Sequence, residues 1–158
     1  MVVFQWRKSL FLLWFKTQTM KKKILYKLSE IKKISKHILD LLGDNKIILF
    51  RGEIGAGKTT LIKNIFKQMG IKDNVTSPTF SIVNEYHINQ EIICHFDLYR
   101  IKSVEELNVI GFESYLDDQK ICFIEWPEII LKYLPKDYLD VYICEYKDIR
   151  KVEITNYK

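Results

Sequence analysis

The chain has 158 residues, of which 47% are hydrophobic and 28% charged, a composition typical of one folded domain with a substantial core. This excludes wholesale disorder, collagen and a coiled coil, and no apolar run approaches the ~18–20 residues that a membrane span needs. The formal net charge of +5 is uneven: residues 1–36 carry ten basic residues and one acid, whereas the other 122 residues carry fifteen basic and nineteen acidic ones. The acidic body does not favour a basic nucleic-acid groove.

Residues 1–19 differ in character from the rest of the chain. Two basic residues and a short apolar stretch from Leu10 to Phe15 faintly resemble a signal peptide, but no small-residue cleavage site follows. A Lys-rich stretch typical of a natural start begins at Met20. We therefore expect residues 1–19 to be an extension outside the fold, the alternative being a weak membrane-surface anchor, and residues 20–158 to form a single domain.

Helix and strand patterns then alternate along the chain. Apolar residues recur at intervals of three and four over 31–42, which predicts a helix with Ser29 as N-cap and Gly43 at its end. An almost continuous apolar run over 46–50 predicts a strand buried on both faces, and the pattern over 58–69 predicts a second amphipathic helix. The remaining predicted elements are strands over 79–86, 92–96, 121–124, 139–146 and 150–155 and a short helix over 104–110. This alternation predicts an α/β sandwich with a mostly parallel central sheet flanked by helices.

The three cysteines, Cys94, Cys122 and Cys144, are odd in number, far apart and embedded in apolar runs. No C-x-x-C spacing occurs, so the sequence indicates neither a zinc site nor a disulfide framework. We expect buried, reduced thiols and a cytoplasmic protein without membrane contact.

The strongest local motif is GEIGAGKT at residues 52–59, which matches G-x-x-x-x-G-K-[ST] between a predicted strand and a predicted helix. Its glycines allow backbone torsions closed to other residues, so main-chain N–H groups can converge on a phosphate at the positive end of the helix. Lys58 can reach the β- and γ-phosphates, and the Thr59 hydroxyl is placed to ligate Mg²⁺. The predicted ATP-binding residues of this loop are Gly52, Glu53, Ile54, Gly55, Ala56, Gly57, Lys58, Thr59 and Thr60.

Two acids, Asp97 and Glu125, each directly follow a predicted apolar strand. An isolated carboxylate at such a position is costly unless it is compensated, so each is a candidate for holding Mg²⁺ or a water molecule. The alternative is that each caps a helix or pairs with a lysine. His95 alternates with Asp97 along its strand, and a satisfied core histidine is favoured over a general base. The hydroxyls of residues 77–79 either sense the γ-phosphate as a switch segment or belong to an ordinary turn.

Several motifs in order resemble one family. They are GEIGAGKTT (52–60), VTSPTFSIVNEY (75–86), HFDLYR (95–100), EELNVIGFESYL (105–116) and ICFIEWPE (121–128). Together they are similar to the bacterial ATPase of tRNA threonylcarbamoyladenosine biosynthesis, the TsaE (formerly YjeE) family, over roughly residues 25–155. The chain departs from the family pattern in residues 1–19 and at Glu53, where the family often has the shorter acid.

The resemblance implies a single P-loop domain that uses ATP and Mg²⁺. It also implies a role in forming threonylcarbamoyladenosine at position 37 of tRNA, with a threonylcarbamoyl transferase subunit and its inactive paralogue as partners; direct contact with tRNA is left open. By the same resemblance, Thr59 and Glu125 ligate Mg²⁺, Asp97 is needed for hydrolysis, and Arg150 falls near a position that approaches the adenine.

Three functions remain: a partner-controlled ATPase, a nucleotide-dependent interaction module with negligible hydrolysis, and a small P-loop kinase. A kinase needs a lid that brings arginines over the phosphates, but after the loop this chain has only Arg100 and Arg150 and no insertion long enough for a lid. We favour the ATPase and expect slow hydrolysis without a partner, since a missing arginine can be worth ~10³–10⁵ in rate. In this mechanism Lys58 steadies charge on the β–γ bridge, and Asp97 orients the attacking water or the metal's water shell.

Overall fold

The computed structural model describes residues 20–117 and 120–158, so the prediction for residues 1–19 lies outside the described residues. The strands are β1 (Met20–Tyr26), β2 (Ile47–Arg51), β3 (Val83–Ile88), β4 (Glu91–Asp97), β5 (Ile121–Glu125), β6 (Tyr138–Tyr146) and β7 (Ile149–Tyr157). The α-helices are α2 (Ile31–Leu42), α3 (Lys58–Met69), α4 (Val104–Val109) and α5 (Phe112–Asp117), and the 3-10 helices are η1 (Leu28–Glu30) and η2 (Pro127–Ile130).

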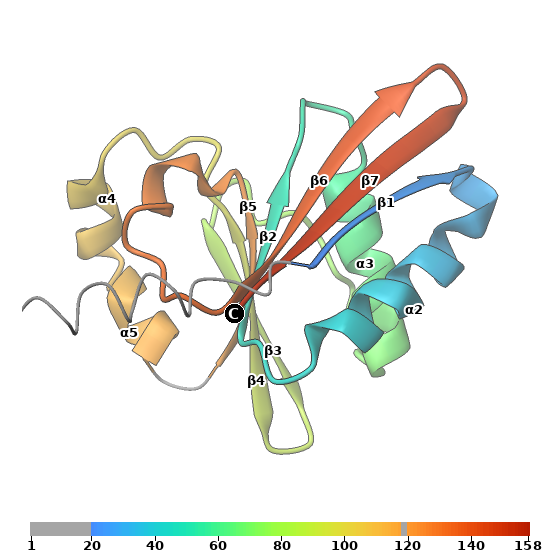
Figure 1. Cartoon of the computed structure of the whole chain (residues 1–158). Helices are drawn as coiled ribbons and strands as arrows, with labels where there is room; N and C mark the ends of the chain where they lie inside the picture. The colour runs from blue at the N-terminus through green and yellow to red at the C-terminus, as the bar shows by residue number, and fades with distance from the viewer. Residues whose placement is uncertain (1–19, 118–119) are drawn as a thin grey trace, which may run out of the picture.

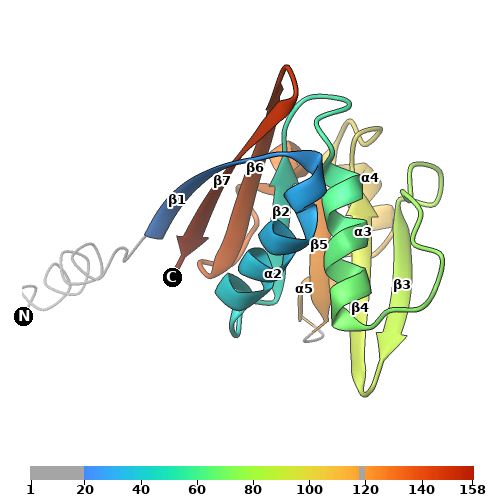
Figure 2. The same cartoon turned by 90° about the vertical axis from the view of Figure 1, so that its right-hand side faces the viewer.

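Within this described part, the strands form one seven-stranded sheet in the order β1-β7-β6-β2-β5-β4-β3. The four strands in the middle, β6, β2, β5 and β4, run parallel, and the edges are antiparallel. Helices α2 and α3 cover one face of the sheet, while α4, α5 and η2 cover the other (Figures 1 and 2). The predicted three-layer α/β sandwich with a mostly parallel centre is confirmed.

Both faces of the central strands are buried, which explains their apolar runs. On β2, Ile48 and Phe50 pack with α2 and α3, whereas Ile47 and Leu49 pack in a second core with α4, α5 and η2. Successive side chains of a strand point to opposite faces, so a strand between two helical layers must be apolar throughout.

An aromatic cluster fixes α3 against the sheet. The Phe66 ring of α3 lies edge-on to Phe123, with 4.8 Å between ring centroids, and also contacts Tyr86 at 5.3 Å and His95 at 5.9 Å. Phe66, Phe123 and His95 are fully buried. This packing holds the helix, and the loop that precedes it, at a defined distance from the ends of β4 and β5.

Two local predictions are wrong. The strand predicted to begin at residue 79 begins at Val83, because the Ile82 N–H donates to the Pro78 carbonyl (2.7 Å) and Ile82 has a positive φ of 65°, which close a turn. Ser29 is not the N-cap of α2; it lies inside η1, and Glu30 precedes the helix while its carboxylate accepts from the Lys27 N–H (2.9 Å). The predicted end of α2 at Gly43 is confirmed.

The sequence patterns also missed α5 and the basic edge strand β1. Lys21 and Lys23 of β1 both contact Glu153 on the neighbouring β7, at 3.2 and 3.5 Å, and Lys151 contacts the same carboxylate at 3.0 Å. Hydrogen bonds from Lys151 and Lys21 lower the pKa of Glu153 to about 2. Pairing of β1 with β7 therefore places a run of lysines beside an acid far along the chain.

All three cysteines are free thiols, as expected. Cys94 and Cys122 are buried, but Cys144, expected to be buried too, is only partly so because it lies where the β6–β7 hairpin extends beyond its neighbours. None of the described helices is long and apolar enough to cross a bilayer.

We expect Phe66→Ala to lower the free energy of unfolding by about 3–5 kcal/mol, since it leaves a cavity under α3. Denaturant unfolding followed by circular dichroism measures this loss. Phe80→Ala is the matched control, because Phe80 is 88% exposed and its main contact is the Arg100 guanidinium over its ring; a cost below about 1 kcal/mol is expected there. Equal losses in the two variants would contradict the packing described above.

Candidate functional site

The C-terminal ends of three parallel strands, β2, β4 and β5, lie at the same edge of the sheet. Strand β2 leads into the glycine-rich loop, β4 ends at Asp97 and β5 ends at Glu125. Asp97 and Glu125 are directly opposite each other in the sheet register, and Phe50 of β2 is opposite Glu125 on the other side. Ligands of open α/β sheets bind at this edge, outside the carboxyl ends of the strands.

The glycine-rich loop has a backbone that only glycines adopt readily. Gly52, Gly55 and Gly57 have φ values of 140°, 82° and 100°. A Cβ at Gly52 would lie 2.1 Å from the carbonyl oxygen of Ile143, so β6 leaves no space for a side chain there. Gly57 is the N-cap of α3 and provides no side-chain cap, so the first-turn N–H groups of this helix are available to an anion.

Lys58 is folded against its own loop. Its ammonium group donates to the carbonyl oxygens of Gly52 (2.7 Å) and Glu53 (2.9 Å) and lies 3.7 Å from the centre of the Trp126 ring. Burial lowers the pKa of Lys58, while the nearby charges of Glu125 and Asp97 act in the opposite direction. A buried cation therefore stands beside two acids at the start of α3.

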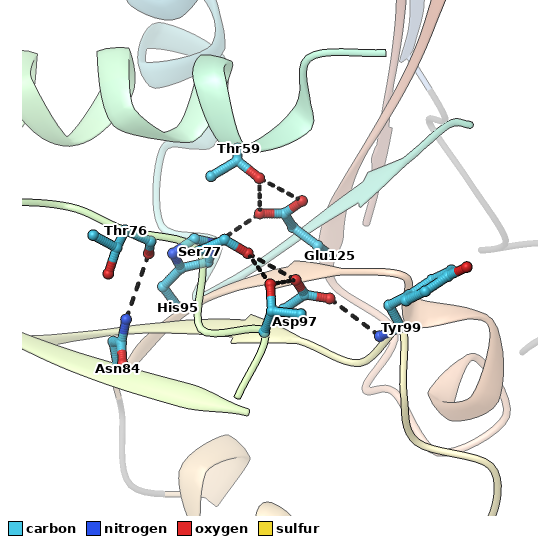
Figure 3. A network of polar contacts seen from close by, with 9 residues as sticks. Thr59, Thr76, Ser77, Asn84, His95, Asp97, Tyr99 and Glu125 are labelled. Carbon is cyan, nitrogen blue, oxygen red and sulfur yellow. Dashed lines mark hydrogen bonds and ion pairs between the residues drawn. The ribbon is translucent and has the colours of Figure 1, made fainter. Parts of the chain in front are cut away.

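Glu125 joins the loop to the sheet (Figure 3). The Thr59 hydroxyl lies 2.8 Å from Oε1 and 3.0 Å from Oε2 of this carboxylate, and Nε2 of His95 lies 2.9 Å from Oε1. Glu125 is 2% exposed and His95 is fully buried. A hydroxyl and a carboxylate in contact form an oxygen donor set of the kind that a hard cation such as Mg²⁺ prefers.

Asp97 is held by a different set of donors (Figure 3). Its Oδ2 accepts from the hydroxyls of Ser77 (2.8 Å) and Thr79 (3.1 Å), and its Oδ1 accepts from the backbone N–H of Tyr99 (3.1 Å). The sequence left two interpretations of residues 77–79, a phosphate sensor or an ordinary turn. In the structure their hydroxyls are directed at Asp97 and tie the segment before β3 to the end of β4.

These groups surround a cavity of about 300 Å³. Of the predicted site residues, those that line it are Ile54, Gly55, Gly57, Lys58, Thr59, Thr60, Asp97 and Glu125. The other three loop residues lie outside the lining: Gly52 packs against β6, Ala56 is buried, and Glu53 is exposed.

Arg150 lies behind the loop. A Cβ on Gly57 would be 3.4 Å from the Arg150 Nε, and Nη2 of the same guanidinium donates to Glu145 at 2.9 Å. The side chain comes from β7 and is not part of the cavity lining. The structure therefore brings Arg150 close to Gly57 of the glycine-rich loop, and its contact with adenine stays a prediction.

Two aromatic residues of the cavity were not predicted as site residues, Tyr99 and Trp126. Trp126 follows β5 with a positive φ of 57°, and its ring lies 4.9 Å from that of Tyr99 as well as over Lys58. The signal in the sequence was Trp126 itself, an aromatic residue directly after the acid that ends a predicted strand. Its position over Lys58 could not be predicted, because Lys58 lies 68 positions earlier in the chain.

Comparison with known proteins identifies the family. The family model described as threonylcarbamoyl adenosine biosynthesis protein TsaE matches residues 25–152. A TsaE of Haemophilus influenzae is 40% identical over 124 residues, 78% of each chain, and one of Rickettsia bellii is 36% identical over 135 residues, 84% of this chain and 93% of that one. A crystal structure of Bacillus subtilis YdiB superimposes with a TM-score of 0.70 and 26% identity, covering 90% of this chain and 89% of the other. The chain therefore belongs to the TsaE family of threonylcarbamoyl adenosine biosynthesis proteins.

Proposed function

We propose that this protein binds ATP with Mg²⁺ on residues 52–60 and hydrolyses it in support of threonylcarbamoyladenosine formation in tRNA. The partners in this proposal are a threonylcarbamoyl transferase subunit and its inactive paralogue. The observation that carries the proposal is the contact between the Thr59 hydroxyl and Glu125 at the mouth of the glycine-rich loop (2.8 and 3.0 Å), which joins the start of α3 to the end of β5.

The loop supplies backbone donors for a triphosphate. First-turn N–H groups of α3 are available without a side-chain cap, and the adjoining cavity is large enough for the phosphates. Lys58 already lies within this loop, where its ammonium group contacts two carbonyl oxygens, and in the proposed complex it would donate to phosphate oxygens in their place.

The residues present also fit a magnesium ion. Thr59 and Glu125 offer a hydroxyl and a carboxylate side by side, and Mg²⁺ is usually bound by one or two carboxylates together with substrate phosphates. When bound, Mg²⁺ neutralises charge on the β- and γ-phosphate oxygens. Thr59 and Glu125 are the residues that would hold the ion.

Asp97 is suited to orient a water molecule. Its three hydrogen-bond donors, from Ser77, Thr79 and the Tyr99 backbone, fix the orientation of the carboxylate, and its oxygens can accept a further hydrogen bond from water. It faces the same cavity as Lys58 and Thr59. In the proposed reaction Asp97 aligns the attacking water or the metal's water shell, while Lys58 steadies charge on the bridging oxygen.

Hydrolysis by the protein alone is expected to be slow. Within residues 20–117 and 120–158 no arginine lines the cavity: Arg51 pairs with Asp140, and Arg100 lies over the exposed Phe80 ring. An arginine that stabilises the transition state contributes ~10³–10⁵ in rate, and a partner protein can supply that charge. The alternative, an interaction module that binds ATP with negligible hydrolysis, differs from this proposal in rate alone.

The decisive experiment is a pull-down with the full chain, with and without ATP, followed by ATPase assay of the protein with the captured partners. We expect ATP-dependent capture of a threonylcarbamoyl transferase complex and faster hydrolysis in its presence. Capture without any stimulated hydrolysis would favour the interaction module.

Lys58→Ala is expected to weaken ATP binding by at least about tenfold, because it removes a charged donor to the phosphates. Isothermal titration calorimetry measures the affinity. Lys63→Ala on the exposed side of the same helix is the control and leaves ATP affinity unchanged. Wild-type affinity in Lys58→Ala would rule out the phosphate cradle.

Asp97→Asn is expected to leave ATP affinity nearly intact while lowering turnover by about 10²–10⁴, since an amide places an N–H donor where the carboxylate accepts from the water that it orients. Steady-state hydrolysis and calorimetry on the same preparation separate the two effects. Asp73→Asn, at an exposed loop position, controls for loss of a negative charge. Parallel losses of affinity and rate would show that Asp97 serves binding and not water orientation.

A further inference from the structure

His95 is a buried polar residue that the mechanism above does not use. It lies on β4 two residues before Asp97, and it is fully buried. Its Nε2 is 2.9 Å from Oε1 of Glu125 (Figure 3), and the Phe66 ring stands edge-on to the imidazole, with 5.9 Å between ring centroids. We infer that His95 is a positioning residue for Glu125: its Nε2–H holds Oε1 and keeps the carboxylate directed at Thr59 and the phosphate loop. This inference rests on the proposed binding of ATP with a divalent cation.

Among the residues that the structure describes, Glu125 is the hydrogen-bond partner of the imidazole. Within residues 20–117 and 120–158, the other ring nitrogen, Nδ1, is buried and has no hydrogen-bond partner. A buried polar nitrogen without a partner costs free energy, so packing alone would be served better by an apolar side chain of similar size. The presence of an imidazole at this position is explained by what Nε2 does for Glu125.

The direction of the hydrogen bond follows from the acceptor. An ionised carboxylate only accepts, so Nε2 carries the proton that faces Oε1. Thr59 also donates to this carboxylate, but a hydroxyl whose oxygen binds a cation must turn its lone pair toward that cation. His95 lies on β4 and does not line the cavity. Its hydrogen bond to Glu125 is therefore independent of what Thr59 binds.

Residues that hydrogen-bond to a metal-ligating side chain and orient it typically contribute about 10–100-fold in metal affinity. The test uses the full chain with Mn²⁺ as the probe ion and a non-hydrolysable ATP analogue. Electron paramagnetic resonance measures free Mn²⁺, and calorimetry in EDTA measures metal-free affinity for the analogue. His95→Leu should bind Mn²⁺ about 10–100-fold more weakly in the presence of the analogue, with unchanged metal-free affinity.

Two further variants separate positioning from packing. His95→Gln places an amide N–H where Nε2 stands, so it should recover most of the Mn²⁺ affinity. Cys94→Ala removes a buried side chain from the same strand on its other face, in the second core, and should leave Mn²⁺ affinity at the wild-type value. If His95→Leu does not fold by circular dichroism, His95→Met tests the same loss of a donor with a more adaptable side chain.

The outcomes are distinguishable. Wild-type Mn²⁺ affinity in His95→Leu, or no recovery in His95→Gln, would overturn the positioning role and leave the proposed function standing. Loss of metal-free analogue affinity in His95→Leu equal to its loss of Mn²⁺ affinity would show a structural role. If the wild-type protein bound neither the analogue nor Mn²⁺, the proposed function itself would fail, and this inference with it.

Discussion

The site depends on burying two carboxylates side by side. Asp97 and Glu125 stand opposite each other on adjacent parallel strands and are 7% and 2% exposed. Like charges on neighbouring strands repel, and a buried carboxylate needs hydrogen-bond donors to replace water. The structure compensates them with hydrogen-bond donors: hydroxyls of Thr59, Ser77 and Thr79, and the imidazole of His95 for Glu125. Such donors stabilise a negative charge without cancelling it, so both acids remain able to attract a cation.

The same donors connect parts of the chain that the sheet alone does not join. Thr59 ties the start of α3 to β5, and Ser77 with Thr79 ties the segment before β3 to β4. Behind them, the Phe66 ring packs on Phe123 and fixes the height of α3 above the sheet. An apolar contact about two helical turns from Thr59 therefore supports the geometry of the polar site, because packed aromatic rings tolerate little displacement.

Much of the fold could be predicted because its signals are local. The runs at 46–50 and 121–124 are almost continuously apolar, and the glycine spacing over 52–59 predicts a tight turn between a strand and a helix. What escaped prediction depends on contacts between distant residues. Strand β1 pairs with β7 near the other end of the chain, so no local signal marks its lysines as a strand. The strand expected from residue 79 is shortened by the turn that Ile82 closes. For the site, Asp97 and Glu125 could be identified because each directly follows an apolar strand. Nothing in the residues around Ser77 predicts that its hydroxyl is directed at Asp97.

The charges that line the cavity link the two proposed ligands. Lys58, Asp97 and Glu125 are the charged residues of that lining, which gives it a formal charge of −1. Such a pocket does not by itself favour a triphosphate, because Lys58 is outweighed by the two acids and already donates to its own loop. A divalent cation beside Glu125 reverses the sign of the pocket, and the phosphates in turn supply ligands that the protein does not. In the proposed function the metal therefore raises the affinity for the nucleotide, and the nucleotide raises the affinity for the metal by the same factor.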